Sequence, residues 1–257
     1  MNIVRYRVNG EIFTGVLEGD LVRQAQGDIF DRLQIGPIAG HVDEVELLAP
    51  VQPSKLIAIG LNYQDHIDED AFDFERPENP IVFLKPPSSL IGHNQPIVLP
   101  AGTEHVDAEA ELCIVIGREC RNVSAAGAYD VILGFTNGND VSARDYQFKD
   151  GQWSRAKGFD TFSPLGPAVV TGVQAGDLEI VSRINGEQRQ SSSTRNLIFD
   201  VPYLIEFVSR VMTLLPGDVI MTGTPAGPPR LAPGDICEVE IAGLGILSNP
   251  VVAEDRP

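Results

Sequence analysis

The sequence predicts a strand-rich α+β fold, a mixed β-roll or barrel with a few short helices packed outside it. Its apolar runs are short and separated by turns, and 25 glycines and 19 prolines are available to form them. Only the segment 202–214 shows the 3.6-residue apolar period of a long helix. Many short strands with few helices are typical of β-rolls and barrels.

A small N-terminal module is expected over residues 1–52. The runs VRYRV and EIFTGVL flank the pair Asn9-Gly10, which favours the type I′ turn of a β-hairpin. The segment LLAPVQPSK then indicates a linker. The main body is therefore predicted over residues 53–257.

The main body begins with strands that are apolar enough to be buried on both faces. They are KLIAIG, IVFLKP, LCIVIG and DVILGF. Asn185-Gly186 then predicts a second hairpin, and two Pro-Gly-Asp turns precede the strands VIMTG and ICEVEIAG.

The charge of the chain narrows the class of partner. The formal net charge is -17 and no basic cluster opposes it, so nucleic acid is excluded as an expected ligand. A small anionic substrate would need local cations in its pocket. Three scattered cysteines without a CxxC pair indicate a reducing compartment. No apolar run approaches the roughly 18 residues of a membrane span, and the N-terminus resembles a strand rather than a signal peptide. We therefore expect a cytoplasmic protein without a membrane partner.

Glu109 and Glu111 are candidate metal ligands. They lie two residues apart at the start of a predicted buried strand, so their side chains leave one face roughly 6 to 7 Å apart. An exposed strand end with alternating polarity would give the same pattern. The apolar residues on both faces after Glu111 favour a position at the mouth of a core.

Asp140 is a third candidate, at a predicted junction between a strand and a short helix. Asp140, Arg144 and Gln147 have i, i+4, i+7 spacing and would line one helical face. Alternatively, Asp140 caps this helix or pairs with Arg144. If the three carboxylates converge within about 5 Å, each pair repels by about 3 kcal/mol at an effective dielectric constant near 20. A bound cation removes that cost, and all-oxygen ligation favours Mg²⁺ or Mn²⁺.

Four further residues are candidates for catalysis or binding. His66 and Glu69 lie three residues apart in GLNYQDHIDED and would form a general base with its orienting carboxylate, although a solvated acidic loop is the alternative. Lys157, in a segment rich in Gly and Pro, could reach a pocket or stay on the surface. Thr224 lies in the turn of MTGTPAG, which could bind a carboxylate or only reverse the chain.

The ordered set of motifs resembles the fumarylacetoacetate hydrolase family from about residue 55 to residue 251. The motifs are GLNYQDHIDE, PIVFLKPPSSLIG, EAELCIVIGR, GFTNGNDVSARDYQ, KGFDTFSPLGP, INGEQRQ and PGDVIMTGTPAG. The resemblance implies a β-roll catalytic domain, a homodimer and a Mg²⁺ or Mn²⁺ ion. It also implies the roles of the candidate residues. The metal ligands would be Glu109, Glu111 and Asp140; the catalytic residues His66, Glu69 and Lys157; and the substrate contacts Arg144, Gln147 and Thr224.

The same resemblance implies a reaction class, in which a small anionic 2-oxo acid reacts through its enolate. The leading expectation is hydrolysis of a carbon-carbon bond in an acylpyruvate such as fumarylpyruvate, in aromatic catabolism. Isomerisation of a 2-hydroxy-dienedioate and decarboxylation of oxaloacetate need the same groups, so the motifs do not separate them. A non-catalytic metal-binding scaffold is the alternative from another class, and a scaffold would not need His66, Glu69 and Lys157.

Overall fold

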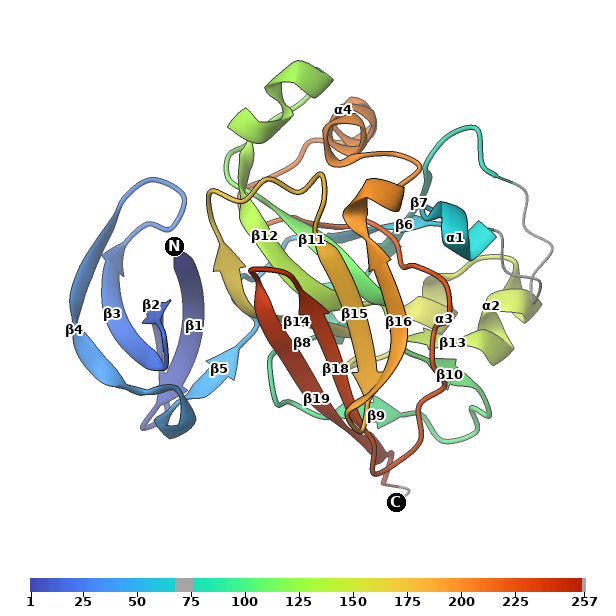
Figure 1. Cartoon of the computed structure of the whole chain (residues 1–257), viewed down its shortest axis with the longest axis horizontal. Coiled ribbons are helices and arrows are strands. Elements are labelled where there is room, and N and C mark those ends of the chain that lie inside the picture. The colour runs from blue at the N-terminus through green and yellow to red at the C-terminus, as the bar shows by residue number, and fades with distance from the viewer. Residues whose placement is uncertain (68–75, 256–257) are drawn as a thin grey trace.

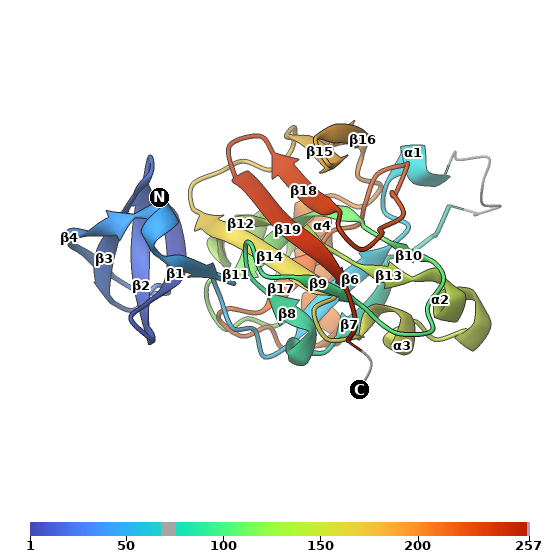
Figure 2. The same cartoon turned by 90° about the horizontal axis from the view of Figure 1, so that it is seen from below.

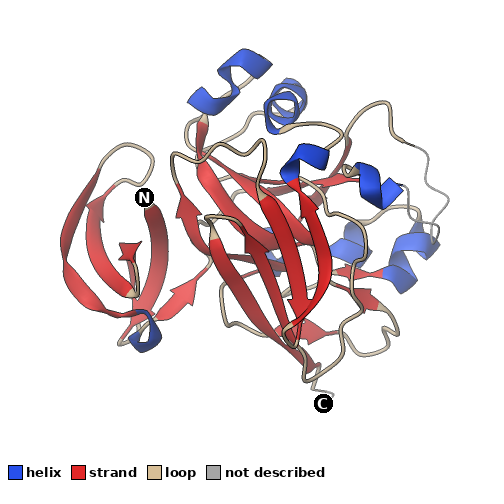
Figure 3. Ribbon diagram, viewed as in Figure 1, coloured by secondary structure: helices blue, strands red, loops and turns tan. Residues whose placement is uncertain are grey.

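The computed structural model describes residues 1–67 and 76–255, and most of its regular structure is β-strand (Figures 1 and 3). A 12-stranded sheet runs through the molecule. Its main path is β4 (Leu33–His41), β3 (Leu21–Gly27), β2 (Glu11–Glu18), β1 (Asn2–Val8), β14 (Ser163–Val170), β12 (Ile132–Asn139), β11 (Ala110–Ile116), β17 (Val219–Met221), β6 (Leu56–Gly60) and β7 (Ile81–Lys85). Beside this path, β5 (Glu46–Leu48) pairs with β1 and β8 (Leu90–Ile91) pairs with β14.

A second sheet lies against the first. It has five strands, in the order β16 (Glu187–Ser193), β15 (Glu179–Ile184), β18 (Ile236–Ile241), β19 (Gly245–Ala253) and β9 (Ile97–Leu99). A third, two-stranded ladder joins β10 (Val106–Asp107) to β13 (Ser142–Ala143). In the described ranges the large sheets stay open. The strand-rich α+β prediction is thus confirmed, and of the two forms proposed the open sheets favour the roll.

The N-terminal strands form a lobe beside the main body (Figures 1 and 2). The predicted hairpin joins β1 to β2, and both Asn9 and Gly10 have the positive φ angles, 51° and 84°, that a type I′ turn requires. β1 also pairs with β14 of the main body through Asn2 and Val170. The lobe therefore continues the large sheet. The expected boundary between residues 52 and 53 falls between β5 and β6.

Strand β11 lies at the centre of the molecule. All seven of its residues are buried, because β12 and β17 pair with its two edges while core clusters cover its faces. Leu112, Ile114 and Ile116 join one cluster, and Cys113 and Val115 join another. The strand that carries Glu111, and that Glu109 directly precedes, is thus held on both edges and both faces.

The helices are short and lie outside the sheets (Figure 3). They are α1 (Gln64–Ile67), α2 (Arg144–Asp150), α3 (Ser154–Lys157) and α4 (Val201–Val211), with 3₁₀ turns at Val42–Glu44, Pro87–Ser89, Ala125–Asp130 and Thr194–Asn196. None of the helices in the described part of the chain has the length and hydropathy needed to cross a membrane.

Helix α4 is shorter than the sequence predicts. Asp200 caps it by accepting a hydrogen bond from the Tyr203 amide, which has no acceptor within the first turn of the helix. The predicted end at residue 214 is wrong, because Met212 is already extended and Leu214 pairs with Cys120 instead. The apolar face is buried at Leu204 and Val208, whereas Val211 is 57% exposed.

A candidate metal centre in a buried pocket

Antiparallel pairing of β11 with β12 brings three carboxylates together. Glu109 directly precedes β11, Glu111 is its second residue and Asp140 directly follows β12. Because Ala110 faces Asn139 in this ladder, the start of one strand meets the end of the other. The Asp140 amide donates a hydrogen bond of 2.9 Å to the Glu109 carbonyl. Residues about 30 positions apart thus share one edge of the sheet.

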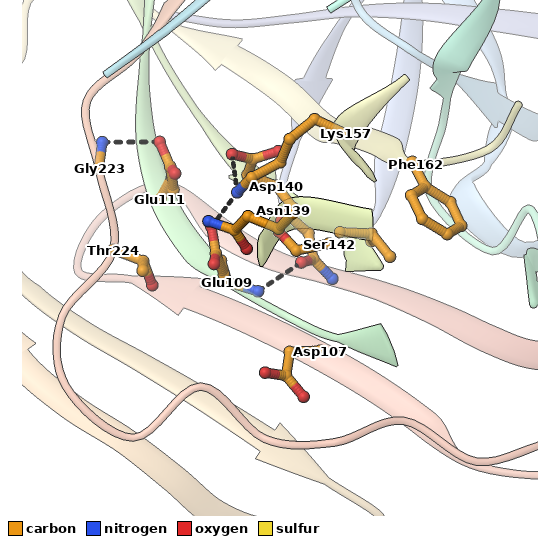
Figure 4. A network of polar contacts seen from close by, with 12 residues as sticks. Asp107, Glu109, Glu111, Asn139, Asp140, Ser142, Lys157, Phe162, Gly223 and Thr224 are labelled. Atoms are coloured by element: carbon orange, nitrogen blue, oxygen red, sulfur yellow. Dashed lines mark hydrogen bonds and ion pairs between the residues drawn. The ribbon is translucent and has the colours of Figure 1, made fainter. Parts of the chain in front are cut away.

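The three carboxylates form a compact buried triad (Figure 4). One oxygen from each of Glu109, Glu111 and Asp140 lies within 4.8 Å of the others, and the residues are 5%, 1% and 1% exposed. The structure therefore brings the three predicted ligands together. Their role as ligands stays a prediction.

The pKa values of two carboxyls of the triad shift in opposite directions. Burial, Asp140 and Glu109 raise the pKa of Glu111 well above its ordinary value. Burial also raises the pKa of Glu109, but the Lys157 and Arg144 charges outweigh it and lower that pKa to about 2. The site therefore resists holding three negative charges on its own. A divalent cation would relieve this, and three hard carboxylate ligands with open positions for water or substrate suit Mg²⁺ or Mn²⁺.

Two buried lysines contact the triad. Lys157, at the end of α3, donates to Glu109 Oε2 at 2.7 Å and Asp140 Oδ2 at 2.6 Å, and Figure 4 shows it between them. Burial lowers the pKa of Lys157, but Asp140 and Glu109 outweigh burial and raise it. Lys85, at the end of β7, contacts Asp140 Oδ1 and donates to the Phe162 carbonyl at 2.8 Å. Lys157 is thus a pocket cation and not a surface lysine.

Arg144 contacts the triad through Glu109. Its Nε donates to Asp107 at 2.7 Å, its guanidinium lies 2.6 Å from Glu109 Oε1, and it donates to Gln147 Oε1 at 2.6 Å. Arg144 pairs with Asp107 and Glu109 and not with Asp140. The alternative of an ion pair between Asp140 and Arg144 is therefore wrong. These bonds direct Arg144 and Gln147 toward the carboxylates, and their role as substrate contacts stays a prediction.

The expected helical face over Asp140, Arg144 and Gln147 is also wrong. Residues 142 and 143 form β13, which pairs with β10, so α2 begins only at Arg144. Asp140 reaches the pocket from the end of β12 instead. The side chains still meet, although sheet pairing rather than helical spacing brings them together.

All the candidate site residues that the structure describes line one pocket. His66, on α1, is 6% exposed and Thr224, after β17, is 5% exposed. Glu69 lies outside the described residues, as does most of the acidic stretch that follows it. The pocket is lined by His66, Glu109, Glu111, Asp140, Arg144, Gln147, Lys157 and Thr224, with an apolar wall of Ile59, Leu61, Phe83, Phe148 and Trp153.

The turn beside Thr224 holds Glu111 through a backbone amide. The Gly223 amide donates to Glu111 Oε2 at 2.7 Å. Gly223 has a φ angle of 102°, and a Cβ there would lie 2.8 Å from Asn62 Cβ, so only glycine fits. The turn therefore does more than reverse the chain.

Lys85 and Asp107 belong to the site but are not among the residues predicted for it. Lys85 ends the run IVFLK, which was expected to be buried on both faces, and a lysine in a buried strand needs a partner. Asp107 is 5% exposed and lies two residues before Glu109, in step with the strand alternation. The sequence pattern around Lys85 and Asp107 is local, whereas the residues that they contact, Asp140 and Arg144, are distant in the sequence.

Comparison with known proteins gives a consistent result. The family model described as "Fumarylacetoacetate (FAA) hydrolase C-terminal" matches residues 55–252, and one described as "Rv2993c-like, N-terminal" matches residues 1–50. A mitochondrial oxaloacetate tautomerase, Fahd2a of Rattus norvegicus, is 44% identical over 221 residues, which are 81% of this chain and 70% of that protein.

Solved structures are similar over nearly the whole chain. A 5-carboxymethyl-2-hydroxymuconate delta-isomerase from Mycobacterium smegmatis is 45% identical with a TM-score of 0.92, covering 99% of this chain and 100% of its own. A maleylpyruvate hydrolase from Sphingobium sp. SYK-6 is 30% identical with a TM-score of 0.82, at the same coverage.

Proposed function

Since the chain belongs to the fumarylacetoacetate hydrolase family, we propose that it converts a small 2-oxo acid through the enol form of that acid. The observation that carries this proposal is the buried triad of Glu109, Glu111 and Asp140, with its oxygens within 4.8 Å and lysine beside it. The family is one of enzymes, so catalysis is favoured over a scaffold.

The triad would hold the ion, Mg²⁺ or Mn²⁺, which when bound supplies the positive charge that draws electrons from the 2-oxo group. The residues around it prepare the site for an anion. Lys157 is buried and keeps its charge, and a buried ammonium stabilises developing negative charge more strongly than it would in solution. Arg144 lines the same pocket and holds Glu109 in place through its guanidinium.

His66 is the proposed proton carrier at the carbon next to the 2-oxo group. It lines the same pocket as Lys157, and histidine is the side chain that most often transfers protons in enzymes. Glu69 as its orienting partner remains a proposal from the sequence. A second copy of the chain as partner, which the resemblance implies, and a cytoplasmic location, which the composition favours, remain proposals too.

Among the reactions open to such an enol, isomerisation or keto-enol tautomerisation is our first candidate. Relatives with those printed activities are 44% and 45% identical to this chain. Oxaloacetate and 2-hydroxy-dienedioates are therefore the first substrates to test. Decarboxylation of oxaloacetate uses the same groups.

Hydrolysis of an acylpyruvate is the second candidate. His66 lies in the pocket where it could activate water, and the maleylpyruvate hydrolase shares the fold at 30% identity. This reaction differs from the first in needing attack by water on the distal carbonyl. It would place the protein in the breakdown of aromatic compounds.

The test is a substrate panel in Mg²⁺, Mn²⁺ or EDTA. Oxaloacetate, a 2-hydroxy-dienedioate and an acylpyruvate are followed by NMR, with deuterium loss at the carbon next to the 2-oxo group as the sign of enolisation. We expect exchange above the rate of free metal ion for at least one member, abolished in Glu109→Gln together with metal binding. No metal-dependent exchange or turnover of any member would reject the proposal and favour the scaffold.

A further inference from the structure

Gln190 is a buried amide on an otherwise exposed strand. Its neighbours on β16, from Glu187 to Arg189 and Ser191, are exposed, whereas Gln190 is 1% exposed. Buried polar side chains are almost always hydrogen-bonded, and each such group has partners that explain it. Gln190 belongs to the INGEQRQ motif, to which the proposed reaction gives no role.

Backbone groups fix the orientation of this amide. Its Oε1 accepts from the Ala110 amide at 3.1 Å, and its Nε2 donates to the Pro225 carbonyl at 2.8 Å. A backbone N-H can only donate and a carbonyl can only accept. A flipped amide would therefore face two like groups, and only one orientation is satisfied.

The fixed amide in turn sets the polarity of the Thr224 hydroxyl. The second hydrogen of Gln190 Nε2 points at Thr224 Oγ1, 2.8 Å away. Thr224 must accept this bond, so its own hydrogen has to be donated elsewhere. Thr224 lines the pocket beside the triad, as Figure 4 shows.

We propose that Gln190 is a positioning residue for substrate recognition: it holds the Thr224 hydroxyl as a hydrogen-bond donor aimed at an oxygen of the bound 2-oxo acid. This inference rests on the proposed function. A donor of fixed direction suits a carboxylate or an enolate oxygen, which only accepts, and disfavours a group that donates.

The Gln190 side chain also contacts β11, the strand that holds two of the proposed metal ligands in place. Ala110, which donates to Gln190, lies between Glu109 and Glu111, while Ser182 of β15 donates to Gln190 Oε1 at 2.9 Å. Loss of Gln190 could therefore change metal affinity as well as substrate affinity. A test has to measure these separately.

The experiment is a double-mutant cycle on binding. Oxalate, a planar and unreactive analogue of a 2-oxo acid, is titrated calorimetrically into Mn²⁺-saturated protein, and the Kd of Mn²⁺ alone is measured by electron paramagnetic resonance. The variants are Gln190→Met, Thr224→Val and the double variant. Thr224→Ser, which keeps the hydroxyl, and Ser182→Ala, which leaves the bond to Thr224, are the matched controls.

We expect Thr224→Val and Gln190→Met each to weaken oxalate binding about tenfold to a hundredfold, as for a hydrogen bond to a charged group. Because Gln190 acts through Thr224, Gln190→Met should add less than about twofold in the Thr224→Val background. Ser182→Ala should bind oxalate within about threefold of the wild type, and Thr224→Ser, as the conservative replacement, should recover most of the affinity that Thr224→Val loses. If Gln190→Met does not fold, Gln190→Glu takes its place. Its carboxylate accepts from Thr224 instead of donating, and it should weaken oxalate binding to the same extent.

Additive effects of the two substitutions, or unchanged oxalate binding in both Gln190 variants, would overturn the positioning role alone. Absence of oxalate binding by the Mn²⁺-saturated wild type would overturn the proposed function and this inference together. The two failures are therefore distinguishable.

Discussion

Replacement of Glu111 by Gln should stabilise the metal-free protein and remove its response to metal. The pKa of this buried carboxyl is raised above its ordinary value of 4.5 by burial, Asp140 and Glu109. Linkage sets an upper limit on the cost of such a raised pKa: about 1.4 kcal/mol for each pH unit above the unfolded pKa, or about 3.5 kcal/mol at pH 7. Gln avoids that cost, which corresponds to roughly 5 to 10 °C in melting temperature.

The sign of the pH dependence follows from the raised pKa. Below pH 4.5 the carboxyl is protonated in both the folded and the unfolded state, so it has no effect on the free energy of unfolding. As the pH rises toward the folded pKa, the unfolded state releases the proton first and the wild type loses stability. The advantage of Glu111→Gln should therefore shrink to under about 1 kcal/mol at pH 5.

The assay is thermal unfolding at pH 5 and pH 7, in EDTA and in Mn²⁺. At a hundred times its Kd the ion should stabilise the wild type by about 2.7 kcal/mol and Glu111→Gln by much less. Glu187→Gln, at an exposed carboxylate, is the control and should change neither value. If Glu111→Gln melts below the wild type in EDTA at pH 7, or gains as much from Mn²⁺ as the wild type, the reasoning about the triad is refuted.

Three further predictions concern single side chains. Lys85→Met should destabilise the metal-free protein by about 3 to 5 kcal/mol in urea, because it leaves Asp140 short of a buried partner, and the loss should be smaller in Mn²⁺. Lys55→Met is the control: it removes a half-buried lysine from the buried Asp218, and its effect should not depend on metal. His66→Ala should slow turnover about 10²- to 10⁴-fold in steady-state assays while the Kd of Mn²⁺ stays unchanged; a parallel loss of metal affinity would contradict its role. Asp200→Ala should lower the free energy of unfolding, measured in urea, by about 1 kcal/mol through the lost helix cap, without any effect on metal affinity.

The parts of the site that depend on local spacing could be predicted from the sequence. Strand alternation puts Glu109 and Glu111 on one face, and their position before an apolar run indicates burial. Asp140 follows the next strand along the chain. An antiparallel pair of neighbouring strands then brings its end to the start of the first.

The parts that depend on distant pairing could not be predicted. Lys85 meets Asp140 across 55 positions, and Gln190 meets Ala110 across 80. Both contacts follow from the order of strands in the sheets, which a single sequence does not reveal. The end of α4 was misplaced for the same reason, because Leu214 leaves the helix to pair with Cys120.

The central claim is that one divalent ion sits among Glu109, Glu111 and Asp140. Anomalous diffraction at the manganese edge, from crystals grown in saturating Mn²⁺, tests it most directly. We expect a single peak about 2.1 Å from one oxygen of each carboxylate. A featureless map among the three side chains, or a peak only elsewhere in the molecule, would contradict the claim.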